Sequence, residues 1–174
     1  MKTEIQTKID NTLTELIQLF STIDQQQINI VPYEGSWTAA QLAQHMILSN
    51  SGFAEMINGP VKETKRNPDE LVERIKSDFL DFTTKMKSPD PIVPAMAQYN
   101  KEDLLNSSKN IRENVHTAIQ TEDLTKTCVM FELPGYGFLT RLEAAHFILY
   151  HTQRHIHQLK KIIRKLANVN ASLS

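Results

Sequence analysis

The sequence predicts an all-α fold, a four-helix bundle with an extra short helix between its second and third long helices. Four long segments carry apolar residues at spacings of three and four, the period of a helix that buries one face. The chain has only 5 Gly and 7 Pro in 174 residues, so few residues that break helices interrupt these segments. We expect a single domain, residues 1–174, since a chain of this length buries roughly 70% of its unfolded surface.

The first half of the chain contains two long helices and the short one. The first helix is predicted over residues 3–24, where apolar residues recur at Ile5, Ile9, Leu13, Leu16, Phe20 and Ile23. After a loop, Ser36 or Thr38 offers an N-cap for a second helix that ends near residue 58. A weaker pattern over residues 69–87 predicts the extra short helix.

The second half follows a proline-rich linker, residues 89–94. Residues 101–120 are predicted to form the third long helix. Residues 121–137 are predicted to be a loop with a short extended piece, and loops over helical scaffolds commonly carry substrate contacts. The last helix, over residues 139–168, is the longest and has the clearest pattern.

Charge and cysteine content narrow the classes of protein. Lys and Arg number 19 against 20 Asp and Glu, a net charge of −1, which argues against nucleic acid or an acidic membrane as partner. The lone cysteine, Cys128, excludes an internal disulfide and suits a reducing compartment. No targeting segment is visible, and no apolar run approaches the roughly 20 residues that span a bilayer. We therefore expect a cytoplasmic protein.

Four of the six histidines belong to the last predicted helix. His151 and His155 are four residues apart, so they share a stripe, and that stripe borders the apolar face. His146 and His157 fall on the polar side with Glu143 and are expected to face water. Two imidazoles at i and i+4 can hold one transition-metal ion, and hydrogen-bonded core histidines are the alternative interpretation.

His45 on the second helix favours the metal interpretation. It lies at the edge of the apolar stripe, and along the same face Ser49 and Gly52 are small enough to leave space beside the imidazole. Three histidines from two facing helices would leave positions on a metal open for water and substrate, as catalytic sites do.

A di-iron site is the rival metal hypothesis. Glu113 with His116, and Glu143 with His146, both match the Glu-x-x-His motif of di-iron bundles. Both glutamates are expected on the side of their helix opposite the apolar stripe, so we expect them to face solvent rather than each other.

Several segments resemble the DinB-like family when they are taken in order. Residues 37–45 match W-[ST]-x-x-x-x-x-x-H at the start of the second helix. Residues 134–137 and 139–143 are similar to the family loop and to the start of its final helix. Residues 150–158 contain H-x-x-x-H-x-x-Q. Residues 60–100 match nothing specific.

The resemblance implies a bundle with up-down-down-up connectivity and one divalent transition metal held by His45, His151 and His155. Zinc, nickel, iron and manganese all suit three imidazoles. Members are described as metal-dependent hydrolases or as thiol transferases that use bacillithiol or mycothiol, and they are often homodimers. The resemblance thus implies a small-molecule substrate, a low-molecular-weight thiol as co-substrate and a homodimer, with no nucleic-acid or membrane partner.

The residues beside the histidines have open roles. Gln158 lies one turn beyond His155 and can orient a ligand, or bond a neighbouring backbone group. Trp37 is either a packing residue or a substrate platform, and Cys128 is either a buried apolar residue or a redox thiol. No acid–base carboxylate stands out near the histidines, so a non-catalytic stress or dimerisation protein with a structural metal, or none, is the alternative function.

Overall fold

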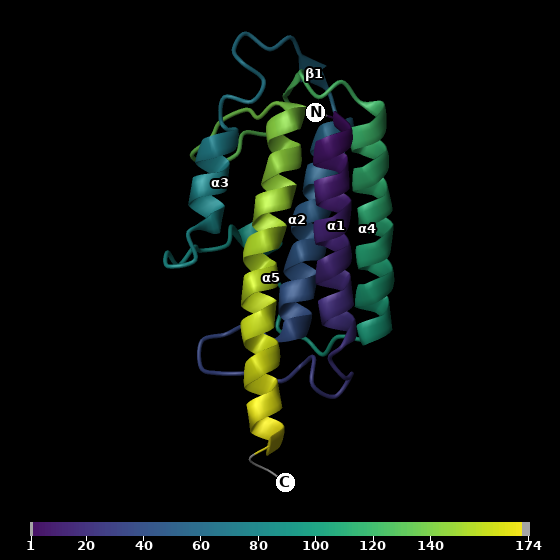
Figure 1. Ribbon diagram of the computed structural model, residues 1–174, viewed down its shortest axis with the longest axis vertical. Coiled ribbons are helices and arrows are strands. Elements are labelled where there is room, and N and C mark those ends of the chain that lie inside the picture. Colours follow the sequence, from purple (N-terminus) through teal and green to yellow (C-terminus); the bar gives the residue numbers. More distant parts are fainter. Residues whose placement is uncertain (1, 172–174) are drawn as a thin grey trace.

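The computed structural model describes residues 2–171, which form four long helices around a common core (Figure 1). The long helices are α1 (Lys2–Ser21), α2 (Ala39–Asn58), α4 (Lys101–Thr121) and α5 (Arg141–Ala171). The smaller elements are α3 (Val72–Leu80), a 3-10 turn η1 (Asp90–Ile92) and the strands β1 (Val61–Lys62) and β2 (Thr127–Cys128). The predicted domain, 1–174, also takes in residues 1 and 172–174, which lie outside the described residues. The predicted all-α bundle with an extra short helix is confirmed.

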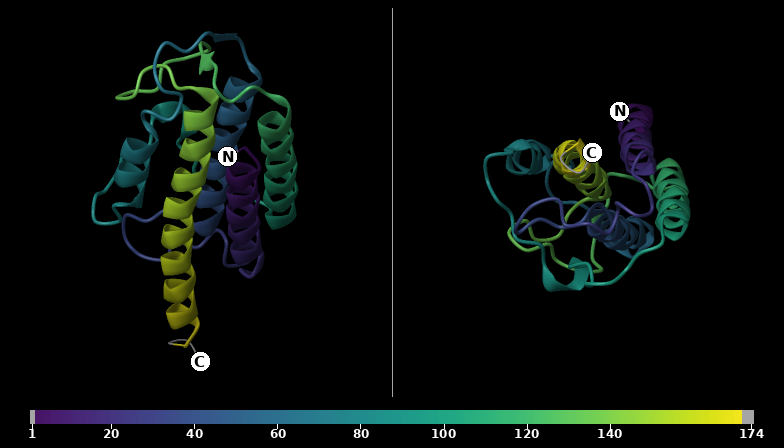
Figure 2. Two further views of the ribbon diagram at one scale, coloured as in Figure 1. Left: turned by 45° about the horizontal axis from the view of Figure 1, so that its top comes forward. Right: turned by 90° about the horizontal axis from the view of Figure 1, so that it is seen from below.

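The connectivity is up-down-down-up, as the resemblance implied. The helices α1 and α5 run in one direction, and α2 and α4 run in the other (Figure 1). Each of α1 and α2 packs against both α4 and α5, so α1 and α2 occupy opposite corners of the bundle (Figure 2). Because α2 and α4 are parallel neighbours, the chain between them must travel back along the length of the bundle.

Capping residues explain where two of the helices begin. The hydroxyl of Thr38 accepts a hydrogen bond from the Gln41 backbone N–H at 3.0 Å, and the Gln41 side chain accepts one from the Thr38 N–H at 3.0 Å. This reciprocal pair is a capping box and selects Thr38 over Ser36 as the N-cap. In α4, the side-chain oxygen of Asn100 accepts a hydrogen bond from the Asp103 N–H at 3.1 Å, without the return bond of a capping box.

The short helix α3 is shorter than predicted. The sequence pattern extended it over residues 69–87, whereas it ends at Leu80. The reason is local competition: the Asp81 carboxylate accepts hydrogen bonds from the Thr83 N–H, at 3.0 Å, and from the hydroxyls of Thr83 and Thr84. Such side-chain turns offer the backbone an alternative to the helix.

A small sheet ties the long connection to the loop before α5. The strands β1 and β2 pair antiparallel, with Val61 opposite Cys128. The strand β2 corresponds to the short extended piece predicted in residues 121–137, whereas β1 was not predicted.

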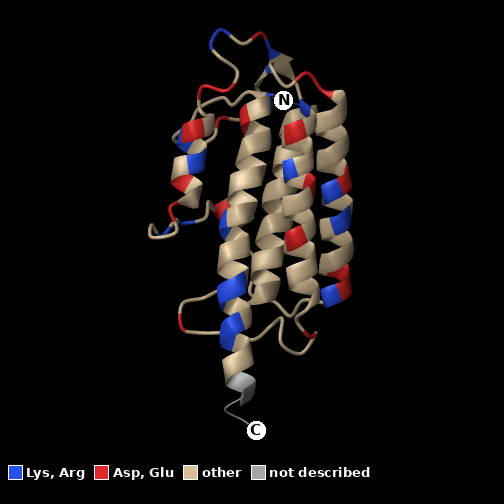
Figure 3. Cartoon of the chain, in the orientation of Figure 1, with Lys and Arg blue, Asp and Glu red and all other residues tan. Residues whose placement is uncertain are grey.

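On the outer faces of α3 and α4, acidic and basic residues are interspersed (Figure 3). Among residues 2–171, no helix combines the length and apolar character that crossing a membrane requires.

Glu143 is buried, which corrects the prediction that it faces solvent. Its side chain is 0% exposed and forms an ion pair with Arg66, whose Nη2 lies 2.6 Å from Oε2. The carboxylate also accepts the backbone N–H groups of Leu71, at 2.9 Å, and of Thr140, at 2.8 Å. The pattern of α5 alone could not show that the connection from β1 to α3 covers this side of the helix. Glu143 therefore fastens that connection to the start of α5.

We predict that Arg66→Ala lowers the free energy of unfolding by about 3 kcal/mol, because it leaves a buried carboxylate without its cation. Urea unfolding followed by far-UV circular dichroism measures this. Lys65→Ala, which removes the same charge from an exposed neighbour, is the control and should change stability by less than about 0.5 kcal/mol. Equal effects of the two substitutions would contradict the assigned role of the ion pair.

Candidate metal centre

A layer of polar side chains interrupts the apolar core where α2 faces α5. Buried apolar residues form two clusters, one that includes Phe53 and Leu149 and one that includes Met46 and Ile156. The polar side chains that contact one another there are all buried: His45, Ser49, His151 and His155. Buried polar groups are stable only with partners, so the partners of this layer indicate its purpose.

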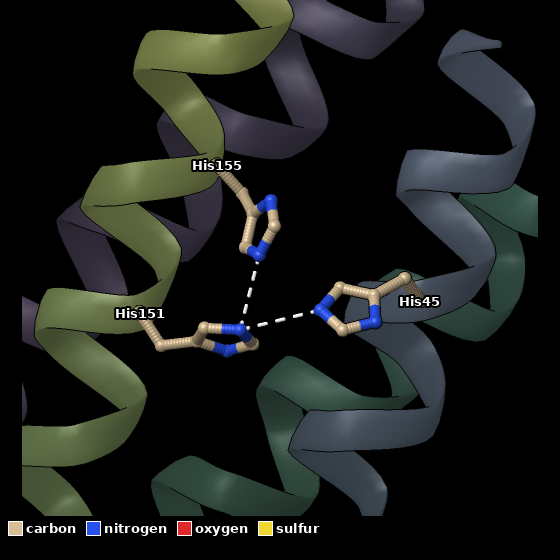
Figure 4. A group of neighbouring side chains, drawn as sticks. All are labelled: His45, His151 and His155. Carbon is tan, nitrogen blue, oxygen red and sulfur yellow. Dashed lines mark hydrogen bonds between the residues drawn. The ribbon is translucent and has the colours of Figure 1, made fainter. Parts of the chain in front are cut away.

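The three predicted histidines meet in this layer. The Nε2 atom of His151 lies 3.2 Å from Nε2 of His45 and 3.0 Å from Nε2 of His155 (Figure 4). One nitrogen from each ring lies within 4.8 Å of the others, and no second cluster of this kind occurs among residues 2–171. The geometry follows from the i,i+4 spacing on α5 and from the packing of α2 against α5. The Glu-x-x-His motifs form no such group.

The opposite nitrogen of each ring is held by the chain. Nδ1 of His45 donates to the Ile92 carbonyl at 2.8 Å, and Nδ1 of His155 donates to Oε1 of Gln158 at 2.9 Å. Nδ1 of His151 lies 3.3 Å from the Ser49 hydroxyl. Carbonyl and amide oxygens only accept hydrogen bonds, so the protons of His45 and His155 are on Nδ1. Their Nε2 atoms are therefore lone-pair donors, the arrangement seen in metal-ligating histidines.

This set of donors fits a divalent transition metal. A single proton on Nε2 of His151 can satisfy only one of the two lone pairs that face it, whereas a cation at their centre satisfies all three rings. Nitrogens at 2.0–2.1 Å from a tetrahedral zinc lie about 3.3 Å apart. The two observed separations, 3.0 and 3.2 Å, are close to that value.

Burial keeps the three rings neutral. It lowers the pKa of His155 to about 3 and the pKa of His151 well below its usual value, and in each case the neighbouring histidines add to the effect. Burial also lowers the pKa of His45, against the opposing effect of its bond to the Ile92 carbonyl. Neutral imidazole is the form that binds metals, so the site is ready for a cation at neutral pH.

Aromatic side chains enclose the histidines. The ring centroids of Trp37 and His45 lie 4.9 Å apart, and the rings of His151 and of Phe79 on α3 form a T-shaped pair with centroids 5.5 Å apart. Phe147 lies 5.4 Å from His151 on the same side and packs against Phe79, with ring centroids 4.6 Å apart. Since Phe79 and Ile92 both belong to the long connection, residues 60–100 help to build the site. The sequence could not show that the backbone carbonyl of Ile92 would be the hydrogen-bond partner of the His45 ring.

The remaining predicted residues differ in what they contact. Gln158 bonds the His155 ring rather than a neighbouring backbone group, and Ser49 bonds His151. Gly52 makes no described contact with the histidines, and a methyl group added there would meet no atom within 4 Å. His157 is exposed, as expected. His146, expected to face water, is half-buried and bonds the Leu142 carbonyl at 2.9 Å.

Comparison with known proteins identifies the family. The sequence matches the DinB superfamily over residues 8–159, which is most of the chain. The chain belongs to the DinB superfamily. No curated protein matches it.

Two solved structures have a fold similar to that of this chain. TT2238, described as a four-helix bundle protein, aligns with a TM-score of 0.59 and 17% identity over 92% of this chain and 99% of its own. YfiT from Bacillus subtilis aligns with a TM-score of 0.60 and 13% identity over 95% of this chain and 87% of its own. YfiT is described as a probable metal-dependent hydrolase with an unusual four-helix bundle topology. At these identities the likeness shows the fold.

Cys128 is not part of the histidine group. It is fully buried on β2, and burial raises the pKa of its thiol to about 11. We predict that iodoacetamide labels it very slowly in the native protein at pH 8, where only about one thiol in a thousand is ionised. Mass spectrometry of labelled protein measures this, with protein denatured in guanidinium chloride as the positive control. Rapid labelling of the native chain would instead favour a redox thiol.

Proposed function

We propose that this protein is a metal-dependent enzyme that acts on a small molecule, by transfer of a thiol or by hydrolysis. One divalent transition metal would be bound by His45, His151 and His155. The observation that carries the proposal is the convergence of three Nε2 atoms whose rings are held at Nδ1 by Ile92, Gln158 and Ser49. Membership of the DinB superfamily and the description of YfiT support it.

Such an ion lowers the pKa of a bound water or thiol, or polarises an electrophile. The chain's part is to hold the ring protons on Nδ1 of His45 and His155 and to exclude water with Trp37 and Phe79.

No carboxylate joins the histidine group among the described residues. Thiol transfer needs an acid–base carboxylate less than hydrolysis does, since a thiol already ionises near pH 8.5. This favours the thiol transferase, with a low-molecular-weight thiol as co-substrate.

We predict that the tag-free protein binds about one divalent metal ion per chain. The single substitutions His45→Ala, His151→Ala and His155→Ala should each abolish stoichiometric binding, because two imidazoles hold an ion much more weakly than three. Elemental mass spectrometry of purified and of metal-reconstituted protein measures the content.

His146→Ala and His157→Ala are the matched controls on the same helix. Neither residue contacts the three predicted ligands directly, so both variants should keep the metal. A wild-type chain that takes up no metal after reconstitution, or equal losses in ligand and control variants, would contradict the proposed site.

A structural metal is the second candidate function, and the closed surroundings of the site favour it. The three ligands are only 2%, 6% and 8% exposed, so a bound ion would be well shielded. In this case the protein would be a non-catalytic stress or dimerisation module.

Activity separates the two candidates. The enzyme is expected to consume bacillithiol, mycothiol or another small thiol in the presence of 1-chloro-2,4-dinitrobenzene, or to hydrolyse 4-nitrophenyl esters, only when it is loaded with metal. A structural metal predicts a lower melting temperature on chelation and no reaction in either assay. The His146→Ala variant, which changes a histidine outside the metal centre on the same helix, controls for a general loss of activity.

A further inference from the structure

One segment of the long connection passes beside the metal centre and contacts His45. This segment, residues 81–93, leaves the end of α3 and reaches η1 beside α2, on the side of the bundle away from α1 and α4 (Figure 2). None of its side chains is buried. Only Ser88 and Ile92 are even half-buried, and both contact Nδ1 of His45. The segment therefore meets the rest of the protein mainly at the site.

The segment of residues 81–93 is also weakly packed. Its large apolar side chains Phe82, Met86 and Val93 are 47%, 43% and 45% exposed. Apart from η1 it has no regular secondary structure. Segments with few buried apolar contacts and solvent-exposed hydrogen bonds open at low cost in free energy.

Arg154 holds one end of this segment. Its guanidinium donates from Nη1 to the carbonyls of Phe79, at 3.2 Å, and Asp81, at 2.8 Å, and from Nη2 to the Thr84 carbonyl. These carbonyls lie at and just beyond the C-terminal end of α3. Helix C-terminal carbonyls lack partners in the helix, and a cation there is favourable. No other side chain among the described residues donates to any of these three carbonyls in the structure.

The remaining attachments are slight, the Ser88 hydroxyl being 3.5 Å from Nδ1 of His45. At the far end, the Ile92 carbonyl accepts the Nδ1 proton of His45. At the end that Arg154 holds, the ring of Phe82 stacks on that of His157, with centroids 4.2 Å apart and planes at 2°. Both of these side chains are exposed.

We propose that residues 81–93 form a gate over the metal centre and that Arg154 is the positioning residue that latches it closed. A small molecule reaches the three histidines when the segment swings away from α2 and α5. Arg154 precedes His155 directly, so the turn of α5 that supplies a metal ligand also holds the cover. The proposal rests on the proposed function only in requiring that a metal is bound; it does not depend on the reaction.

The first test measures how fast a chelator removes the metal from the loaded protein, with 4-(2-pyridylazo)resorcinol as the probe. Arg154→Ala removes three charge-assisted hydrogen bonds and should accelerate removal by about tenfold or more. Arg154→Lys cannot reach three carbonyls at once, so its rate of metal removal should lie between those of the wild type and Arg154→Ala. Arg164→Ala removes the same charge from an exposed position on the same helix and should match the wild type.

Hydrogen exchange read by mass spectrometry supplies a readout that needs no metal. In Arg154→Ala, exchange should accelerate in peptides covering residues 79–93 and stay unchanged in α1 and α4. A general loss of stability would instead raise exchange everywhere. If the wild type binds no metal, the proposed function fails, and this measurement still decides whether Arg154 latches the segment.

A reversible lock tests the gate without touching Arg154. The double variant Phe82→Cys with His157→Cys is designed so that oxidation joins two exposed positions whose rings stack in the wild type. The oxidised form should lose metal to the chelator more slowly than the reduced form, and a reductant should restore the rate. Identical rates in both forms, together with an Arg154→Ala variant that behaves as the wild type, would overturn the proposal.

Discussion

The structure depends on satisfying three imidazoles in the middle of a helical core. Each ring has two nitrogens, and neither can be left without a partner once it is removed from water. The chain supplies partners for the Nδ1 side only: Ile92 for His45, Gln158 for His155 and Ser49 for His151. The Nε2 atoms face one another, and a cation is the partner that suits all of them. The apolar clusters above and below keep water from taking that place.

The same helix that carries two of these rings also organises the connection beside them. The helix α3 has no side-chain N-cap of its own and, with nine residues, is too short to be stable alone. The Glu143 carboxylate accepts the Leu71 N–H at its N-terminal end, and the Arg154 guanidinium binds carbonyls at its C-terminal end. An anion at the start and a cation at the end complement the helix dipole. Two charged residues of α5 thus set the position of α3, and with it that of Phe79 over His151.

Sequence patterns were informative where one helix determines the outcome. Periodicity located the long helices, and the i,i+4 spacing of His151 and His155, with His45 on a facing helix, placed the three rings together. The patterns were uninformative where a feature depends on segments far apart in sequence. The face of α5 that bears Glu143 reads as solvent-facing until the connection that covers it is known. The end of α3 depends on the turn built by Asp81, which competes with a helix that periodicity favours.

The parallel arrangement of α2 and α4 has a consequence for how such a protein can diversify. A return along a 20-residue helix covers about 30 Å, which roughly ten extended residues can span. Residues 59–100 are several times that number, so most of this connection is not needed to close the bundle. Its sequence and length can therefore change while the helices, and the three histidines they present, stay in place. One scaffold can in this way present the same three histidines beside a connection of variable sequence and length.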